Sequence, residues 1–181
     1  MTDQTERALD GYLIALIRGG SREAFDRLAR RWTPRLLRYA ARVLGRQEAA
    51  RDIVQETWIG AIRGLNRLDD PARFPAWIYG IAHRKCIDGI RFAQRQRRLV
   101  SSIEQESALA AESALRAVPG ESADLAVAIS RLNHEQRDVV HLFYGEDLGI
   151  DDIASILNVP AGTVKSRLHH AREYLRKQLG D

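Results

Sequence analysis

The fold is decided most clearly between residues 150 and 172, which read IDDIASILNVPAGTVKSRLHHAR. A helix of seven residues is expected first, then a tight turn at residues 158–160, then a long helix from about residue 161 to 178. Apolar residues that recur at helical spacing would face inward: Ile153, Ala154 and Leu157 on the first helix, and Val164, Leu168, Ala171 and Leu175 on the second. This spacing around so short a turn predicts a helix-turn-helix unit.

The opposite face of the second helix carries small, polar and basic residues. A recognition helix in the major groove of DNA presents such a face to base edges and phosphates. A solvated basic helix end is the alternative, because the helix dipole favours basic residues near a C-terminus. The outward face and its flanks consist of Gly162, Thr163, Lys165, Ser166, Arg167, His169, His170, Arg172 and Glu173.

The rest of the chain also reads as helical, since it has no alternating Val, Ile or Thr run bounded by hairpin turns. Helices are expected over residues 5–18, 22–44, 47–65, 70–98, 122–132 and 133–145, with Pro34 kinking or breaking the second and Ser122 capping the fifth. The residues expected inward are Val54, Trp58, Ala61, Ile62 and Leu65 on the third helix, and Phe74, Trp77, Ile78, Ile81 and Cys86 on the fourth.

Charge is segregated along the chain. The net charge is +5 over residues 82–98, −4 over residues 99–125 and +4 over residues 160–177. The acidic segment is rich in Ser and Ala and is punctuated at Pro119, which is typical of a linker. We therefore expect an all-α protein of two small helical domains, residues 1–98 and 125–181, joined by a flexible acidic linker over residues 99–124.

Composition narrows the class of protein further. The chain has 181 residues, 45% of them hydrophobic and 29% charged, and a net charge of +4. Its longest apolar run is far shorter than the roughly 20 residues that cross a bilayer, and its first residues lack a signal pattern, so we expect neither membrane insertion nor export. Cys86 is the one cysteine, which fits a reducing compartment such as the cytoplasm.

Catalytic chemistry is not indicated. The Ser, His and Asp residues form no nucleophile motif, and no glycine-rich phosphate loop is present, so we expect no enzyme. Five histidines raise the question of a metal, but His134 and His141 lie about two turns apart and no ligand cluster accompanies them. Neither a metal site nor a cofactor is expected.

The N-terminal half carries two further candidate surfaces. Residues 74–91, which read FPAWIYGIAHRKCIDGIR, interleave aromatic and basic residues, as surfaces that stack unpaired bases do. Aromatic residues at helical spacing, such as Phe74 and Trp77, are more often part of a core. Asp52, Gln55 and Glu56 share one face of the third helix, which is either a solvated face or a surface for an arginine-rich protein partner.

Together these segments resemble a bacterial RNA polymerase sigma factor of the extracytoplasmic-function (group IV) type. Residues 52–58, DIVQETW, resemble region 2.2, and residues 74–91 resemble regions 2.3 and 2.4. Residues 132–137, LNHEQR, resemble the start of region 4.1, and residues 162–172 resemble region 4.2. The last segment is also similar to output domains of two-component regulators, but the four segments in this order are specific.

The resemblance implies the partners and the residues that bind them. It implies that Asp52, Gln55 and Glu56 dock on the clamp coiled coil of the polymerase β′ subunit, that the β flap is a second polymerase contact, and that the loop at residues 66–72 captures a flipped base of the −10 element. The implied −10 residues are Asn66, Arg67, Asp69, Arg73, Arg84, Lys85 and Arg91. The implied −35 residues are Lys165, Ser166, His169 and His170 at the base edges, Thr163 and Arg167 on the backbone, and Arg172 beside them.

The chain departs from the family pattern at three positions. Arg84 stands where Asn is common, so it is a candidate phosphate contact, and His169 and His170 stand where larger or more basic residues are common. The resemblance also implies an anti-sigma factor as a partner. Two other classes of protein remain open: a helix-turn-helix regulator that acts without polymerase, and a sigma mimic that binds an anti-sigma factor and no DNA.

Overall fold

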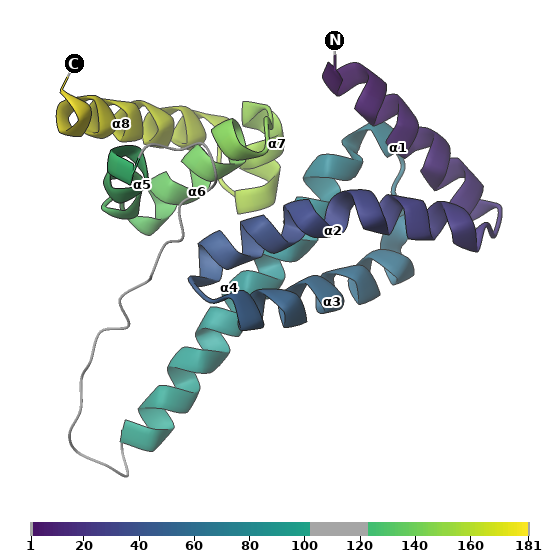
Figure 1. Cartoon of the computed structure of the whole chain (residues 1–181), viewed down its shortest axis with the longest axis horizontal. Coiled ribbons are helices and arrows are strands. Elements are labelled where there is room, and N and C mark those ends of the chain that lie inside the picture. The colour runs from purple at the N-terminus through teal and green to yellow at the C-terminus, as the bar shows by residue number, and fades with distance from the viewer. Residues whose placement is uncertain (1, 102–122, 181) are drawn as a thin grey trace. The chain divides into compact units, whose positions relative to one another are not determined.

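The computed structural model describes residues 2–101 and 123–180, and the chain divides into two compact units, Met1–Ser113 and Ala114–Asp181 (Figure 1). Every regular element in the described ranges is helical, which confirms the all-α prediction. Most of the expected linker, residues 102–122, and the expected cap at Ser122 lie outside the described residues. None of the described helices combines the length and the apolar character that crossing a membrane requires.

Over residues 2–101, unit 1 contains four α-helices and two short 3₁₀ turns. The helices are α1 (Thr2–Arg18), α2 (Arg22–Leu44), α3 (Gln47–Gly64) and α4 (Phe74–Ser101), and the turns are η1 (Leu65–Arg67) and η2 (Pro71–Arg73). A kink or a break was expected at Pro34, and a break does not occur, because α2 runs through it. The fourth helix was expected to begin at residue 70, but residues 71–73 form the 3₁₀ turn η2 and α4 begins at Phe74. The Asp70 side chain caps η2 by accepting a hydrogen bond from the Ala72 amide at 2.9 Å.

The core of unit 1 is a row of aromatic rings between α2 and α4. Trp32 packs edge-to-face on Phe74 and Tyr79, with ring centroids 5.4 and 5.8 Å apart, and Tyr79 packs on Tyr39 at 5.2 Å. Such pairs add about 0.5–1.5 kcal/mol each beyond the area that they bury. The predicted burial of Phe74, Ile78 and Cys86 is confirmed, whereas Trp77 and Ile81 are only half-buried.

The predicted inner face of α3 is right at most positions and wrong at one. Val54, Ala61 and Leu65 are buried and Trp58 is half-buried, but Ile62 is 59% exposed. Thr57 is buried in addition, and its hydroxyl donates to the carbonyl oxygen of Ile53 at 2.7 Å. Satisfying the hydroxyl within the helix lets a polar residue occupy a core position.

A buried polar cluster joins α1 to α2. The carboxylate of Asp10 accepts hydrogen bonds from Nε of Arg31 at 3.0 Å and from the indole Nε1 of Trp32 at 3.2 Å. Glu6 lies beside it and pairs with Arg35 at 2.7 Å. Burial raises the pKa of Asp10, although the bonds from Trp32 and Arg31 oppose that shift. These contacts fix the position of α1 against the rest of unit 1.

Unit 2 contains the helix-turn-helix. Its elements are α5 (Ala123–Ser130), α6 (His134–Val140), a π-helical turn η3 (His141–Gly145), α7 (Ile150–Leu157) and α8 (Ala161–Leu179). Asn133 caps α6, since its side-chain oxygen accepts from the Gln136 amide at 2.8 Å. On α7, Ile153 and Ile156 are the buried residues, while Ala154 and Leu157 are only half-buried. The inner face of α7 is therefore rotated by about one residue from the predicted one.

Candidate nucleic-acid interface

The helix-turn-helix holds one face of α8 in the core of unit 2 and turns the other to solvent. α7 ends at Asn158, which has a left-handed conformation with φ of 54°, and the Val159 amide donates to the Ala154 carbonyl at 3.1 Å. Pro160 then opens α8 in an extended conformation. The predicted inward residues Val164, Leu168 and Ala171 are buried and Leu175 is half-buried, while Lys165, Ser166, His169, His170 and Arg172 are exposed.

Two flanking residues of α8, Thr163 and Arg167, are not fully exposed. Thr163 is half-buried. The side chain of Arg167 is 20% exposed, and its Nη2 lies 2.8 Å from Oε2 of Glu135 on α6. The positive charge of Arg167 is thus balanced within the protein, and the ion pair ties α8 to α6.

Arg172 is held by two aromatic residues that the sequence analysis did not single out. Its Nε donates to the hydroxyl of Tyr144 at 2.6 Å, and its guanidinium lies 5.5 Å from the ring centroid of Phe143 and 5.6 Å from that of Tyr144. Both rings belong to η3, and π-helical turns are frequent at functional sites. The sequence feature that could have indicated these two residues is their position as an aromatic pair directly before Gly145.

The candidate −10 residues of unit 1 fall into two groups. Asn66, Arg67, Asp69 and Arg73 are exposed on the segment that joins α3 to α4. Leu65 and Leu68 anchor this segment, because their side chains are 4% and 7% exposed. Polar side chains therefore project outward from a segment whose apolar residues are fixed in the core.

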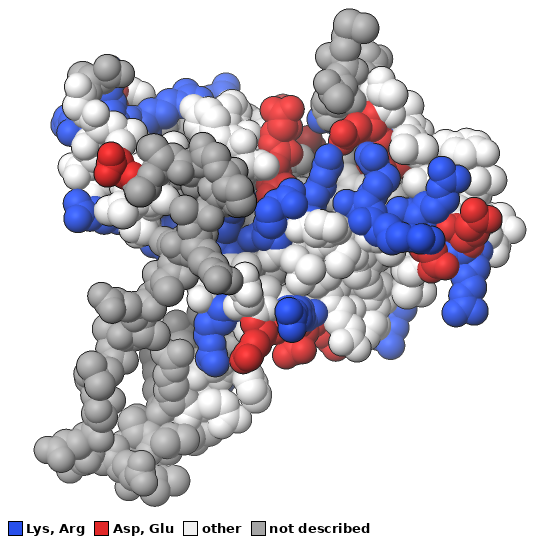
Figure 2. Space-filling view, viewed as in Figure 1, with Lys and Arg blue, Asp and Glu red and all other residues white. Residues whose placement is uncertain are grey.

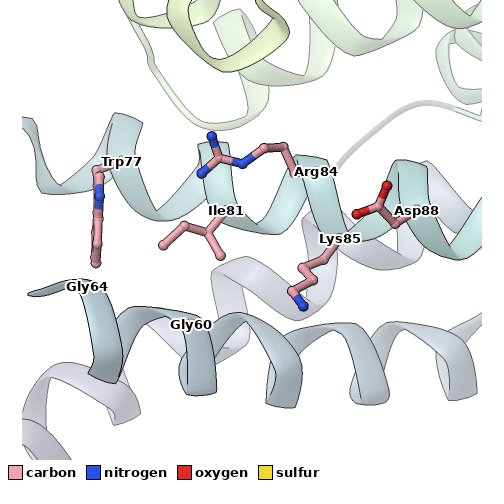
Figure 3. A pocket seen from close by; sticks show the side chains of 7 residues that line it. All are labelled: Gly60, Gly64, Trp77, Ile81, Arg84, Lys85 and Asp88. Atoms are coloured by element: carbon pink, nitrogen blue, oxygen red, sulfur yellow. The ribbon is translucent and has the colours of Figure 1, made fainter.

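The second group lies along α4. Arg84 and Lys85 line a groove of about 390 Å³ between α3 and α4, with Gly64 at one end beneath the ring of Trp77 (Figure 3). A Cβ atom at Gly64 would lie 3.0 Å from Cζ2 of Trp77, so glycine allows this close approach. Arg91 is exposed two turns further along α4 and does not line the groove.

The three predicted polymerase-binding residues share an exposed face. Asp52, Gln55 and Glu56 are all exposed on α3. Nζ of Lys85 reaches across from α4 to Oε2 of Glu56 at 3.1 Å, with side chains 39% and 53% exposed. An exposed pair of this kind stabilises a fold by about 0–1 kcal/mol. The acidic face of α3 and the groove, whose charged lining residues are Arg84, Lys85 and Asp88, therefore meet at this weak ion pair.

A further basic surface lies on α2 and was not anticipated. In the space-filling view, Lys and Arg side chains gather over α2 (Figure 2). Glu6 and Asp10 neutralise Arg31, and Glu6 also pairs with Arg35, whereas Arg27, Arg30 and Arg38 are exposed. The signal was present in the sequence, because α2 contains seven arginines. Within residues 2–101 and 123–180, no cluster of three or more His, Cys, Asp or Glu residues could hold a metal ion.

Comparison with known proteins identifies both units. The Sigma-70 region 2 family matches residues 28–96, and the Sigma-70 region 4 family matches residues 122–175. A region 2 followed by a region 4 defines a protein of the sigma-70 class.

Two relatives narrow the class, and one solved structure shares the fold. The chain is 32% identical to ECF RNA polymerase sigma factor SigW of Bacillus subtilis over 93% of this chain and 95% of the relative. It is 36% identical to ECF RNA polymerase sigma factor SigL of Mycobacterium tuberculosis over 80% and 82%. The fold resembles that of the sigma factor RpoE from Bartonella quintana, solved with the anti-sigma factor NepR, with a TM-score of 0.68, 22% identity and coverage of 86% and 96%.

The chain belongs to the extracytoplasmic-function (ECF) family of RNA polymerase sigma factors, which confirms the resemblance found in the sequence. As a sigma factor it is a polymerase-binding subunit for transcription initiation. A helix-turn-helix regulator that acts without polymerase is not favoured, because that class of protein does not account for the region 2 match over residues 28–96.

Proposed function

We propose that this sigma factor directs core RNA polymerase to promoters by placing α8 on the −35 element and the α3–α4 region on the −10 element. The observation that carries the proposal is the pairing of regions 2 and 4 in one chain, with an exposed basic surface in each unit. Because it acts on chromosomal promoters, its place of action is the cytoplasm.

The −35 element would be read by the outward face of α8. Lys165, Ser166, His169 and His170 are exposed there and carry donors and acceptors that can meet base edges in the major groove. Thr163 and Arg172 flank the face and would contact phosphates, with Arg172 already oriented by Tyr144, whereas Arg167 would reach a phosphate only by leaving Glu135. Arg27, Arg30 and Arg38 of α2 would add a sequence-independent attraction to DNA.

The −10 element would be bound by unit 1 after the strands separate. Asn66 and Asp69 carry the groups that could recognise an unpaired base, and extruding that base costs a few kcal/mol that its pocket must offset. Arg67 and Arg73 would contact the neighbouring phosphates. Arg84, Lys85 and Arg91 would extend the phosphate track along α4.

Protein partners would use other faces. Asp52, Gln55 and Glu56 would meet basic residues of the β′ clamp coiled coil, and unit 2 would contact the β flap. Since RpoE has been solved with the anti-sigma factor NepR, we include an anti-sigma factor among the proposed partners of this chain.

The test is co-elution of the purified chain with core RNA polymerase, followed by run-off transcription on a library of genomic fragments. Co-elution with new start sites is expected, and the start sites would define the promoter. Replacing Asp52 and Glu56 with Ala should reduce assembly by at least about tenfold, because charged contacts at the interface are lost. A matched control replaces Glu23 and Asp26, which are exposed acidic residues of α2, and should assemble normally.

Each negative outcome has a definite meaning. Duplex binding without co-elution would favour the regulator that acts without polymerase. Binding to neither DNA nor polymerase would favour the sigma mimic. Normal assembly of the variant lacking Asp52 and Glu56 would remove this face from the polymerase interface while leaving the sigma function intact.

A further inference from the structure

The segment that would capture the −10 base is attached to a helix far from it in the sequence. Nη2 of Arg18, in the last turn of α1, donates to the carbonyl oxygen of Leu65 at 3.3 Å and also to that of Leu68. Leu65 and Leu68 bracket the exposed pair Asn66 and Arg67. One guanidinium therefore holds the backbone on both sides of the residues proposed to meet DNA.

The same segment contacts α1 at a second point. A Cβ atom at Gly11 would lie 3.7 Å from Cβ of Pro71, which is ordinary van der Waals distance, so η2 packs closely on α1. α1 is itself fixed to α2 by the buried cluster around Asp10. The chain between α3 and α4 thus rests on a helix whose own position is determined.

The chemistry of Arg18 suits a brace better than a phosphate contact. Hydrogen bonds from a guanidinium to neutral carbonyls are charge-assisted, and arginine can serve several acceptors from one rigid group. The Leu68 amide also donates to the Leu65 carbonyl at 3.3 Å, which closes η1. Adding a donor from outside the turn restricts the direction in which Asn66 and Arg67 project.

We propose that Arg18 is a positioning residue for capture of the −10 base: it holds the backbone of residues 65–68 so that Asn66 and Arg67 are already oriented when the strand separates. This inference rests on the proposed function, because it assumes that the segment binds the −10 element. Fixing the segment before binding removes an ordering cost that would otherwise weaken capture. Arg18 lies outside the part of the chain matched by the region 2 family, residues 28–96.

The variants are Arg18→Ala, Arg18→Lys and the control Arg22→Ala. Arg22 is an exposed arginine four residues away, so its loss changes the net charge equally. Hydrogen–deuterium exchange of the full chain, measured without DNA, should accelerate at residues 65–70 in Arg18→Ala and remain unchanged in Arg22→Ala. Lysine keeps the charge and one donor group, so Arg18→Lys should fall between them.

The functional measurement uses holoenzyme on a promoter found in the run-off experiment. Permanganate reactivity of unpaired thymines should fall by about three- to tenfold in Arg18→Ala, since two bonds from a charged but exposed donor are lost. Assembly with core polymerase and binding to a −35 duplex should not change. A double variant with Asn66→Ala should lose less promoter opening than the sum of the two single losses, because both changes act on the same segment.

The outcomes separate this inference from the function on which it rests. Unchanged exchange at residues 65–70, or normal opening by Arg18→Ala where the wild type opens the promoter, would overturn the role of Arg18 and leave the sigma function standing. Additive losses in the double variant would also overturn it. A wild-type holoenzyme that opens no promoter would overturn the proposed function itself.

Discussion

Lys165 and Arg167 each contribute one positive charge to α8, but the structure predicts different consequences when they are replaced with Ala. Lys165 is exposed, and no ion pair to it is present in the parts of the chain that the structure describes. Arg167 is 20% exposed and pairs with Glu135 at 2.8 Å. Lys165 is therefore free to displace counterions from DNA, whereas Arg167 must first leave a carboxylate.

The difference can be expressed as a salt dependence. Each phosphate that a protein cation neutralises contributes about 0.9 to the slope of log K against log salt concentration. The affinity ratio of wild type to Lys165→Ala should therefore narrow by about 3.5-fold between 50 and 200 mM salt. For Arg167→Ala we expect less than half of that change in slope. We also expect a loss of about 0.5–1 kcal/mol in the unfolding free energy of unit 2, because the partly exposed ion pair between α6 and α8 is broken.

Fluorescence anisotropy with a labelled −35 duplex, titrated at several salt concentrations, measures these slopes. Glu135→Ala is the informative third variant, since it releases Arg167 and should make the slope steeper. Lys177→Ala is the control, because Lys177 is exposed near the C-terminal end of α8, three turns beyond Lys165. Equal losses of slope for Lys165→Ala and Arg167→Ala, with no change in Glu135→Ala, would refute the reasoning and show that Arg167 leaves its carboxylate to bind DNA.

Three further predictions concern stability. Gly64→Ala should lower the unfolding free energy of unit 1 by about 1 kcal/mol or more in urea denaturation, because the added Cβ would meet Trp77 at 3.0 Å. Gly80→Ala is the control: no atom lies within 4 Å of the added Cβ, so the higher helix propensity of alanine should raise the same free energy by about 0.5–1 kcal/mol. The hydrogen bond from His134 to Asp138, 2.9 Å long, raises the pKa of His134 in the folded protein, although partial burial opposes that shift. The bond to protonated His134 therefore adds to the unfolding free energy in full below the ordinary histidine pKa of about 6.5, and this contribution is lost as pH rises through the raised pKa of the folded state. Urea titrations of wild type and Asp138→Asn between pH 6 and 8 should show that only the wild type has this decline, and parallel curves would contradict it. The thiol of Cys86 is fully buried, so its labelling by a soluble disulfide reagent should follow unfolding, and fast labelling of the native protein would contradict the packing.

The sequence predicted best where periodicity is long. On α8, four apolar positions spread over three turns determine one face, and the buried residues lie where the spacing placed them. α7 has only eight residues, and its apolar spacing fits two alternative inward faces almost equally well. Only packing against the other helices selects Ile156 over Leu157 for the core.

Polar contacts between distant segments could not be predicted in the same way. Periodicity says which face of a helix is outward, but not that Arg167 meets Glu135 or that Arg18 meets the carbonyls of residues 65 and 68. Such contacts depend on how helices are placed in three dimensions. The uninterrupted course of α2 through Pro34 has a related cause, since tertiary packing offsets the local cost of one missing hydrogen bond.

The π-helical turn at residues 141–145 determines how many residues this part of the chain must contain. Such a turn accommodates one residue more than an α-helix of the same rise, so it is equivalent to a single-residue insertion. Deleting one residue there would restore regular α-helical winding and turn the rings of Phe143 and Tyr144 by about 100° away from Arg172. The register of α7 and α8 could survive such a deletion, while the aromatic contact to Arg172 could not. The length of this turn is therefore tied to the orientation of one arginine on the helix that we propose reads the −35 element.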